Sequence, residues 1–458
     1  MENKTEIKDS SVRNRILWLL VIASRLIVGA TFIFSGFVKA IDPTGSAIKF
    51  EEYFSVLGIG FLSPLSLFFG VVLAAFEFLL GINTLLGSYR KLTSWLVLLV
   101  MCFMTPLTLY LAIADPVSDC GCFGEALVLT NWETFFKNVF LLIPVLFLVR
   151  YNSLVKGVYN KSVQWLTVLY SLLFALALAW FGVYFQPILD FRPYKVGVNI
   201  LEAISGGNID AGDDYLFVYE KGGIRKEFSL DDIPMNDTTW VFVDRIEKKN
   251  ISDKKKSSIE DFIIRSGEDD VDIARDILED PQYTFLLLTP SLENADESEI
   301  DKINDLYDYA LAYGYNFYCV TASSDSAIAV WQDNTGADYP FYRMDETTIK
   351  TIIRGNPGVM LLHKGTIIWK QLPSHLPDEA QLNDEIENLP IGRTWVYDGS
   401  KNLGILVSIY AVPMFILLLT EKTVAAIIGK IREARQKRRE KNLLWYLRKN
   451  KSNSYFII

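Results

Sequence analysis

The sequence predicts an α-helical membrane bundle of about six spans, joined to an α/β domain on the outer side of the membrane. Half of the 458 residues are hydrophobic, and the apolar runs are concentrated in the first 190 residues and in one segment near the C-terminus. Residues 190–400 have instead the composition of an acidic soluble protein, with strand-like and helix-like patterns in alternation. A chain of this length holds more than one domain.

Six apolar segments are long enough to cross a membrane, which takes about 20 mostly apolar residues. The first has no small-residue cleavage site of the kind that ends a removable signal peptide, so we interpret it as an anchor. The fourth is the shortest. The expected spans are residues 16–38, 62–86, 92–114, 134–150, 164–186 and 402–420.

Lysine and arginine near the span ends set the orientation. With six spans, the basic residues within 4–15, 90–91, 150–161 and 430–441 all fall on one side. The loop 115–133 contains no Lys or Arg and falls on the other side, together with 187–401. We therefore expect a multi-pass protein of the bacterial inner membrane. Its N-terminus (1–15) and basic tail (421–458) would be cytoplasmic and its large domain periplasmic. The tail is either a topology anchor or an amphipathic helix on anionic lipid.

The composition excludes several classes of site. Four cysteines are too few for a disulfide-rich scaffold. The two histidines, His363 and His375, make a histidine-based metal centre improbable, and we expect no metal. We also expect no nucleic-acid partner. The partners that we expect are the lipid bilayer and an unidentified periplasmic protein or client.

Two of the four cysteines, Cys120 and Cys122, stand in one short polar loop between the third and fourth spans. The bacterial periplasm is oxidising, so a close pair there favours thiol–disulfide exchange. Gly121 and Gly124 would allow unusual backbone dihedrals in this loop. The nearby acids Asp119 and Glu125 would tend to raise the pKa of a thiol.

Other interpretations of the pair stay open. It could be a structural disulfide that pins the loop, a weak metal contact, or two unpaired thiols. A structural bridge normally joins more distant segments, because longer loops gain more stability. The remaining cysteines, Cys102 inside the third span and Cys319 in an apolar strand, are expected to be buried and inert.

Arg25 and Glu77 are ionisable residues inside predicted spans. Each is nine or ten residues from the cytoplasmic end of its segment, so we expect an interhelical pair at one depth. The functional alternative is proton or quinone handling. Lys39, at the outer end of the first span, is expected to snorkel to the surface. The small residues Ser35, Gly36, Gly70 and Gly81 suit close helix packing.

Three motifs resemble the DoxX/MauE-like membrane proteins, in particular a Bacteroidota type with a soluble C-terminal extension. The first, R-L-x-x-G-x-x-F-x-x-S-G-x-x-K, comprises Arg25, Leu26, Gly29, Phe32, Ser35, Gly36 and Lys39. E-F-x-L-G follows at 77–81, and D-C-G-C-F-G at 119–124. D-F-R-P-Y-K-V-G-x-N-I at 190–200 looks like the same group, so the resemblance covers about residues 15–200.

The resemblance implies membrane-associated electron transfer through a thiol pair. It makes Cys120 and Cys122 the catalytic residues, and quinone a cofactor to which Arg25, Glu77 and Lys39 would bind. The residues themselves indicate no cofactor, and the resemblance fixes no substrate. The family core has four spans, whereas this chain has more, plus a large outer domain.

The outer segment from 281 to 400 alternates strands and helices. We expect strands at 282–290, 315–322, 339–345, 359–365 and 366–371, with helices at 296–313, 324–336 and 346–355. This order is similar to the thioredoxin fold, in which a cis proline precedes the fourth strand, and Pro357 takes that position. The C-x-x-C motif of that family has no counterpart here, because the matching residues are Ser291, Leu292, Glu293 and Asn294.

Residues 191–280 are expected to form a periplasmic α+β subdomain. A hairpin turns at Gly222-Gly223, a third strand follows near 240, a solvated linker spans 248–258, and a strand and a helix complete it.

Two functional hypotheses follow. In the first, the chain is an inner-membrane thiol–disulfide oxidoreductase whose Cys120–Cys122 pair passes electrons to quinone. In the second, it is a non-enzymatic subunit of an envelope complex, with a protein-binding thioredoxin-like domain and a structural cysteine pair.

Overall fold

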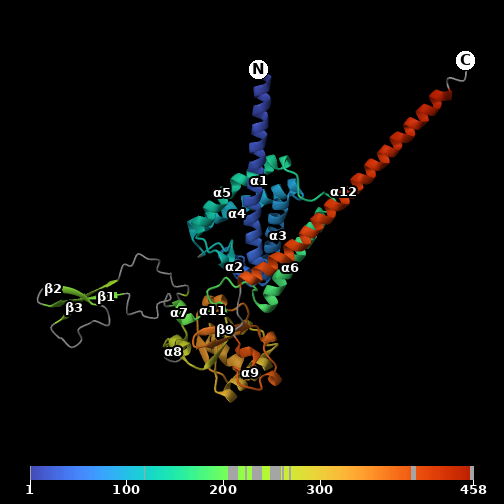
Figure 1. The fold of residues 1–458 in the computed structure, drawn as a ribbon. Helices are drawn as coiled ribbons and strands as arrows, with labels where there is room; N and C mark the ends of the chain where they lie inside the picture. The colour runs from blue at the N-terminus through green and yellow to red at the C-terminus, as the bar shows by residue number, and fades with distance from the viewer. Residues whose placement is uncertain are drawn as a thin grey trace. The chain divides into compact units, whose positions relative to one another are not determined.

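The computed structural model describes residues 2–117, 119–204, 215–221, 224–228, 240–247, 259, 262–267, 270–393 and 399–453. The chain divides into two units (Figure 1). The membrane unit comprises Met1–Val183, Pro187–Leu189 and Gly399–Ile458, and the sheet unit comprises Tyr184–Gln186 and Asp190–Asp398. The predicted linker 248–258 and the turn at Gly222-Gly223 lie outside the described residues.

The described part of the membrane unit contains six helical segments long and apolar enough to cross a membrane. They are Arg13–Ile41, Gly60–Leu86, Arg90–Ala114, Asn131–Leu154, Gln164–Phe185 and Gly399–Leu444. Each overlaps one predicted span, which confirms the prediction of six, and the chain is a multi-pass membrane protein. The helices are α1 (Glu2–Ile41), α3 (Ser66–Leu86), α4 (Arg90–Ala114), α5 (Asn131–Tyr151), α6 (Gln164–Phe185) and α12 (Gly399–Asn453).

A further helix, α2 (Pro43–Val56), joins α1 to α3 and was not predicted. Its start follows local rules, since Pro43 occupies the first turn and the Asp42 side chain accepts a hydrogen bond from the Gly45 N–H at 2.9 Å. The helix is short and carries Lys49 and Glu52, so its hydropathy does not mark it as a span. It places polar side chains beside the cysteine loop.

Helices α1 and α3 cross at close range through glycine. A Cβ atom on Gly36 would lie 2.3 Å from the backbone nitrogen of Phe78, and one on Gly81 would lie 2.4 Å from that of Ile33. The expected close packing at these two glycines is therefore confirmed. Figure 1 shows the bundle formed by α1, α3, α4 and α5.

The sheet unit is built on a six-stranded sheet of order β4-β7-β6-β5-β8-β9. Strands β5, β6 and β7 are parallel, whereas β8 and β9 form an antiparallel hairpin beside β5, and β4 is antiparallel to β7. The strands are β4 (Arg265–Ser266), β5 (Tyr283–Thr289), β6 (Asn316–Thr321), β7 (Phe341–Arg343), β8 (Gly358–His363) and β9 (Thr366–Gln371).

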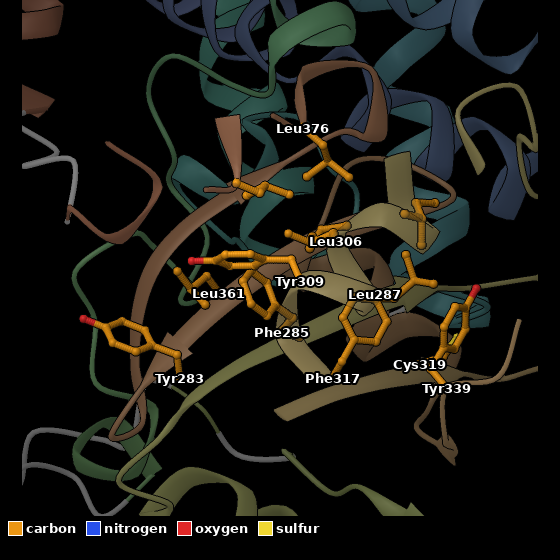
Figure 2. Packing of buried hydrophobic residues seen from close by; sticks show 14 of the residues in the cluster. Tyr283, Phe285, Leu287, Leu306, Tyr309, Phe317, Cys319, Tyr339, Leu361 and Leu376 are labelled. Atoms are coloured by element: carbon orange, nitrogen blue, oxygen red, sulfur yellow. The ribbon is translucent and has the colours of Figure 1, made fainter. Parts of the chain in front are cut away.

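Helices cover both faces of this sheet. On one face Phe285 and Leu287 of β5 pack against α9 (Ile300–Tyr313) and α10 (Asp325–Thr335), and Figure 2 shows this core. On the other face Leu286 and Leu288 pack against residues of α7 (Ile200–Ile204), α8 (Ala274–Glu279) and α11 (Glu346–Ile352). A strand buried on both faces has no polar alternation, which explains the continuous apolar run of β5.

The predicted order of elements from 282 to 371 is confirmed, and the Asn356–Pro357 peptide bond is cis. The main sheet also includes residues from the segment assigned by sequence to a 191–280 subdomain, because β4 pairs with β7 and α8 packs on the sheet. The predicted hairpin is present as β1 (Tyr215–Lys221) and β2 (Ile224–Phe228). With β3 (Val241–Glu247) it forms a three-stranded antiparallel sheet of order β2-β1-β3.

The segment 190–200 runs along β9 as a strap. The Gly197 N–H donates to the Ile367 carbonyl at 2.7 Å, and the Ile200 N–H donates to the Gly365 carbonyl at 2.8 Å. The D-F-R-P-Y-K motif therefore contributes Asp190 and Arg192 to the interior of the sheet unit, where both are buried.

Candidate functional site

The cysteine loop joins α4 to α5 and is fixed at both ends. The Asn131 side chain donates to the Asp115 carboxylate at 2.9 Å and to the Val117 carbonyl at 2.8 Å. Helix α5 begins with a capping box between Thr130 and Glu133, which satisfies backbone donors that the first turn leaves free. The loop is therefore held by specific contacts at the point where it enters the bundle.

The two sulfurs lie next to each other. Cys120 and Cys122 are free thiols with Sγ atoms 2.9 Å apart. Gly121 and Gly124 both have the positive φ that the loop was expected to need, at 63° and 51°. A side chain at Gly121 would also approach the Lys49 side chain at 2.9 Å. A residue other than glycine between the cysteines would therefore strain the backbone that pairs them.

A buried ion pair holds the backbone of Cys122. Lys39 Nζ lies 2.7 Å from Glu77 Oε2, and it donates to the Cys122 carbonyl at 2.9 Å and to Ser35 Oγ at 2.8 Å. Ser35 Oγ lies 2.8 Å from Glu77 Oε2 and 2.7 Å from the Cys122 carbonyl, and its single proton serves one of them at a time. All three ammonium protons of Lys39 thus have acceptors.

Two expectations about intramembrane charge are wrong. Lys39 does not snorkel, because it is buried against Glu77. Arg25 does not pair with Glu77 but donates to the Asn152 side chain at 2.6 and 2.8 Å and to the Val155 carbonyl at 2.8 Å.

The physical reason is the register of α1 on α3. Gly36 faces Phe78 and Gly29 faces Leu85, so Arg25 falls beside Gly87, past the end of α3. Counting residues from the predicted span ends placed Arg25 too deep. Ser35 and Lys39, one helical turn apart, are the residues that face Glu77.

A further lysine at the site, Lys137 of α5, was missed. Its Nζ lies 4.2 Å from the ring centroid of Phe123, the residue after Cys122. The signal was in the sequence, because Lys137 is an ionisable residue inside the predicted fourth span. It was overlooked because it belongs to none of the motifs.

The two thiols have different electrostatic surroundings. The hydrogen bond from the Cys120 thiol, with the positive charges of Lys137 and Lys39, lowers the pKa of Cys122 to about 6 against the opposing effect of burial. The hydrogen bond with Cys122, together with burial, raises the pKa of Cys120. The main influences on the two thiol pKa values do not include Asp119, which was expected to raise them. Asp119 is paired with Lys49 at 3.0 Å and accepts from the Gly121 N–H at 2.8 Å.

Two cavities meet at the cysteine loop. The larger, of about 670 Å³, has mostly apolar walls from α2, α3 and α4, and Lys39, Lys49, Tyr53 and all of Cys120–Cys122 also line it. The smaller, of about 40 Å³, is lined by Glu77, Lys137 and Cys122, among others.

Cys102, expected to be buried, is exposed on α4 and also lines the larger cavity. Cys319 is buried in the core of the sheet unit, as expected (Figure 2).

Metal ligands are not gathered anywhere in the described ranges, where no group of three or more His, Cys, Asp or Glu could hold a metal ion. The chemistry that the arrangement does offer is that of two thiols, one of them readily ionised, beside an apolar cavity.

The six apolar helices define a multi-pass membrane protein in a lipid bilayer, with the cysteine loop inside its N-terminal half. Residues 16–150, from α1 to α5, match the family model described as methylamine utilisation protein MauE. This match supports a MauE/DoxX-like membrane family for that part of the chain. A second model, described as a domain of unknown function, matches residues 214–250. No curated protein and no solved structure matches the chain.

Proposed function

We propose that this protein carries out thiol–disulfide exchange at the outer face of the bacterial inner membrane. The observation that supports this most directly is the pair of free thiols 2.9 Å apart, Cys120 and Cys122, in a loop between two spans. Oxidation would join the two sulfurs with little movement of the loop, and reduction would return the thiols. The pair would thus pass two electrons at a time.

The family match agrees with a redox role. The matched model is described by methylamine utilisation, and a membrane protein in redox maturation of that type is the broader function we infer. The particular substrate is an outer-face protein partner with a dithiol or disulfide.

Membrane quinone is the second substrate that we propose. A cavity of about 670 Å³ has the size of a small-molecule site, and its mostly apolar walls suit an isoprenoid quinone. Lys49 supplies a polar hydrogen in its lining, and the Tyr53 hydroxyl donates to the Cys120 carbonyl at 2.5 Å. The quinone would accept two electrons from the reduced pair and two protons, one from the Cys120 thiol and one from solvent.

The intramembrane charges divide into two roles. Lys39, which is paired with Glu77, donates to the carbonyl of Cys122. Lys39 lines the larger cavity and Glu77 the smaller, so we assign both residues to the site. Arg25 binds the loop after α5, and we assign it a structural role.

The sheet unit would serve as a protein-binding module. Its strand order and the cis Pro357 agree with a thioredoxin-like fold. Ser291 and Glu293, at the position of the missing C-x-x-C, are hydrogen-bonded to each other at 2.9 Å. Such a domain could present a client to Cys120 and Cys122 without doing dithiol chemistry. The alternative is an envelope-complex subunit in which the cysteine pair is structural.

Thiol trapping in intact cells tests the proposal and the orientation together. A mass-tagged, membrane-impermeant maleimide should add two tags at Cys120 and Cys122 after reduction, and none after a water-soluble quinone analogue is added. Protection by quinone should disappear in the Cys120→Ser variant. If the pair stays oxidised in reductant, or if quinone leaves both thiols free, the redox function is wrong. Tagging only after the inner membrane is permeabilised would overturn the orientation.

A further inference from the structure

We propose that Cys122 is the sulfur that exchanges with the redox partner, that Cys120 is the resolving sulfur, and that Lys137 fixes this order by stabilising the Cys122 thiolate. This inference rests on the proposed thiol–disulfide function and assigns the roles of Cys122, Cys120 and Lys137 in it.

Access distinguishes the two sulfurs. Cys122 lines both cavities, whereas Cys120 lines only the larger one. Both cysteines contact the apolar cluster of Leu111 and Val117, but Cys120 is buried, at 6% exposed, whereas Cys122 is half-buried. A disulfide partner has to approach the attacked sulfur in line, so the less enclosed Cys122 is the sulfur that a partner can reach.

The charges around the two thiols also favour Cys122 as the sulfur that exchanges. Lys39 and Lys49 lie near the loop, but their charges are offset by Glu77 at 2.7 Å and Asp119 at 3.0 Å. Lys137 forms no salt bridge with any carboxylate in the part of the chain that the structure describes. It shares the 40 Å³ cavity with Cys122, and not with Cys120. The charge of Lys137 favours the thiolate form of both cysteines, and it acts through a small buried cavity in which little water screens it.

The exchange balances as follows. When the pair is oxidised, a partner thiolate attacks Cys122 Sγ, the Cys120–Cys122 bond breaks, and Cys120 leaves and takes up a proton. The partner's second thiolate then attacks the mixed disulfide, which releases Cys122 as a thiolate and the partner as a disulfide. The partner loses two electrons and two protons. The pair gains both electrons and one proton, and the other proton goes to solvent. Lys137 stabilises the thiolate that is released last.

Alkylation kinetics test this order. The full-length chain, reduced in lipid nanodiscs, is pulsed with iodoacetamide over a pH series, and mass spectrometry locates each adduct, so that Cys102 and Cys319 do not interfere. At pH 7 Cys122 should react at least about tenfold faster than Cys120, with a midpoint near pH 6.

The Lys137→Met variant isolates the cation. It should raise the Cys122 midpoint by about one pH unit, and Lys137→Arg should restore it. Lys161→Met removes an exposed lysine from the loop before α6 and should leave the profile unchanged. A midpoint in Lys137→Met equal to that of the unsubstituted chain, or faster labelling of Cys120, would overturn the inference.

A second measurement covers the case in which Lys137→Met does not fold. In cells, Cys120→Ser should accumulate a mixed disulfide with a partner protein, and Cys122→Ser should not; the reverse pattern contradicts the assigned order. The labelling order does not depend on turnover. If quinone fails to oxidise the pair while Cys122 still reacts first, the proposed function fails and the assignment of Lys137 stands.

Discussion

The carbonyl of Cys122 accepts from Lys39 at 2.9 Å and lies 2.7 Å from the Ser35 hydroxyl, and both groups also contact Glu77. The buried Lys39–Glu77 pair therefore sets the position of the Cys122 sulfur by holding the backbone carbonyl of Cys122. Moving the pair would move the sulfur, so the stability of α1 on α3 and the reactivity of the loop are linked.

Lys39→Met should destabilise the membrane unit by about 3–5 kcal/mol, because it leaves the Glu77 carboxylate buried without its cation. It should also slow the alkylation of Cys122, since a positive charge is lost and a negative one is uncovered beside the thiolate. Thermal unfolding in nanodiscs measures the first effect. The double variant Lys39→Met/Glu77→Gln should regain much of the loss, and a double variant less stable than Lys39→Met would contradict this account.

Motif-level reasoning located most of this site but not all of it. Ser35, Lys39, Glu77 and the cysteines belong to motifs, and all of them meet in the structure. Lys137 is absent from the motifs. Its role depends on which face of α5 is turned toward the cysteine loop. The apolar run of the fourth span does not indicate which face that is.

At the scale of elements, the glycines on α1 and α3 determine how deeply the two helices interlock. The predicted pairing of Arg25 with Glu77 failed at this scale. Residue counts give depth along one helix, whereas the register between two helices follows from where small residues allow the backbones to touch. Helix α2 was missed for another reason, since its mixed polarity resembles that of a connecting loop.

Gly36→Ala tests the crossing. The added Cβ would meet the Phe78 backbone nitrogen at 2.3 Å, which no side-chain rotation relieves, so α1 and α3 must separate. We expect a loss of about 1–3 kcal/mol and weaker contact between Lys39 and the Cys122 carbonyl, seen as slower alkylation of Cys122. Gly404→Ala on α12 is the matched control, because nothing lies within 4 Å of its added Cβ. Equal stability of the two variants would mean that the crossing tolerates a wider spacing.

The sheet unit was the most predictable part of the chain. Its strands are apolar runs bounded by turn residues, and its helices have one apolar face, so local pattern and tertiary burial agree. The sequence did not reveal that β4 joins the sheet, because a two-residue edge strand leaves almost no periodic signal.

At the scale of the whole molecule, the strap after α6 brings the D-F-R-P-Y-K motif into the sheet unit. Arg192 and Lys370 contact the Asp190 carboxylate at 2.7 and 2.8 Å. Burial acts to raise the pKa of Asp190, but these two cations outweigh it and hold that pKa well below its usual range. Burial, with the repulsion of Arg192, lowers the pKa of Lys370 to about 7 in spite of Asp190.

This depressed pKa makes the stability of the sheet unit depend on pH. Between pH 7 and the ordinary lysine value of 10.5, unfolded chains bind a proton at Lys370 that folded chains have begun to lose, so stability rises with pH in that window. From pH 7 to 8.5 we expect a gain of about 1–2 kcal/mol.

Lys370→Met should abolish that gain, whereas Lys364→Met, which removes an exposed lysine from the turn before β9, should keep it. Thermal unfolding of the full chain, followed by tryptophan fluorescence, measures the difference between variants. If the stability of Lys370→Met and that of the unsubstituted chain change equally with pH, Lys370 stays protonated throughout this range. Asp190 would then compensate for the burial of the Lys370 ammonium group.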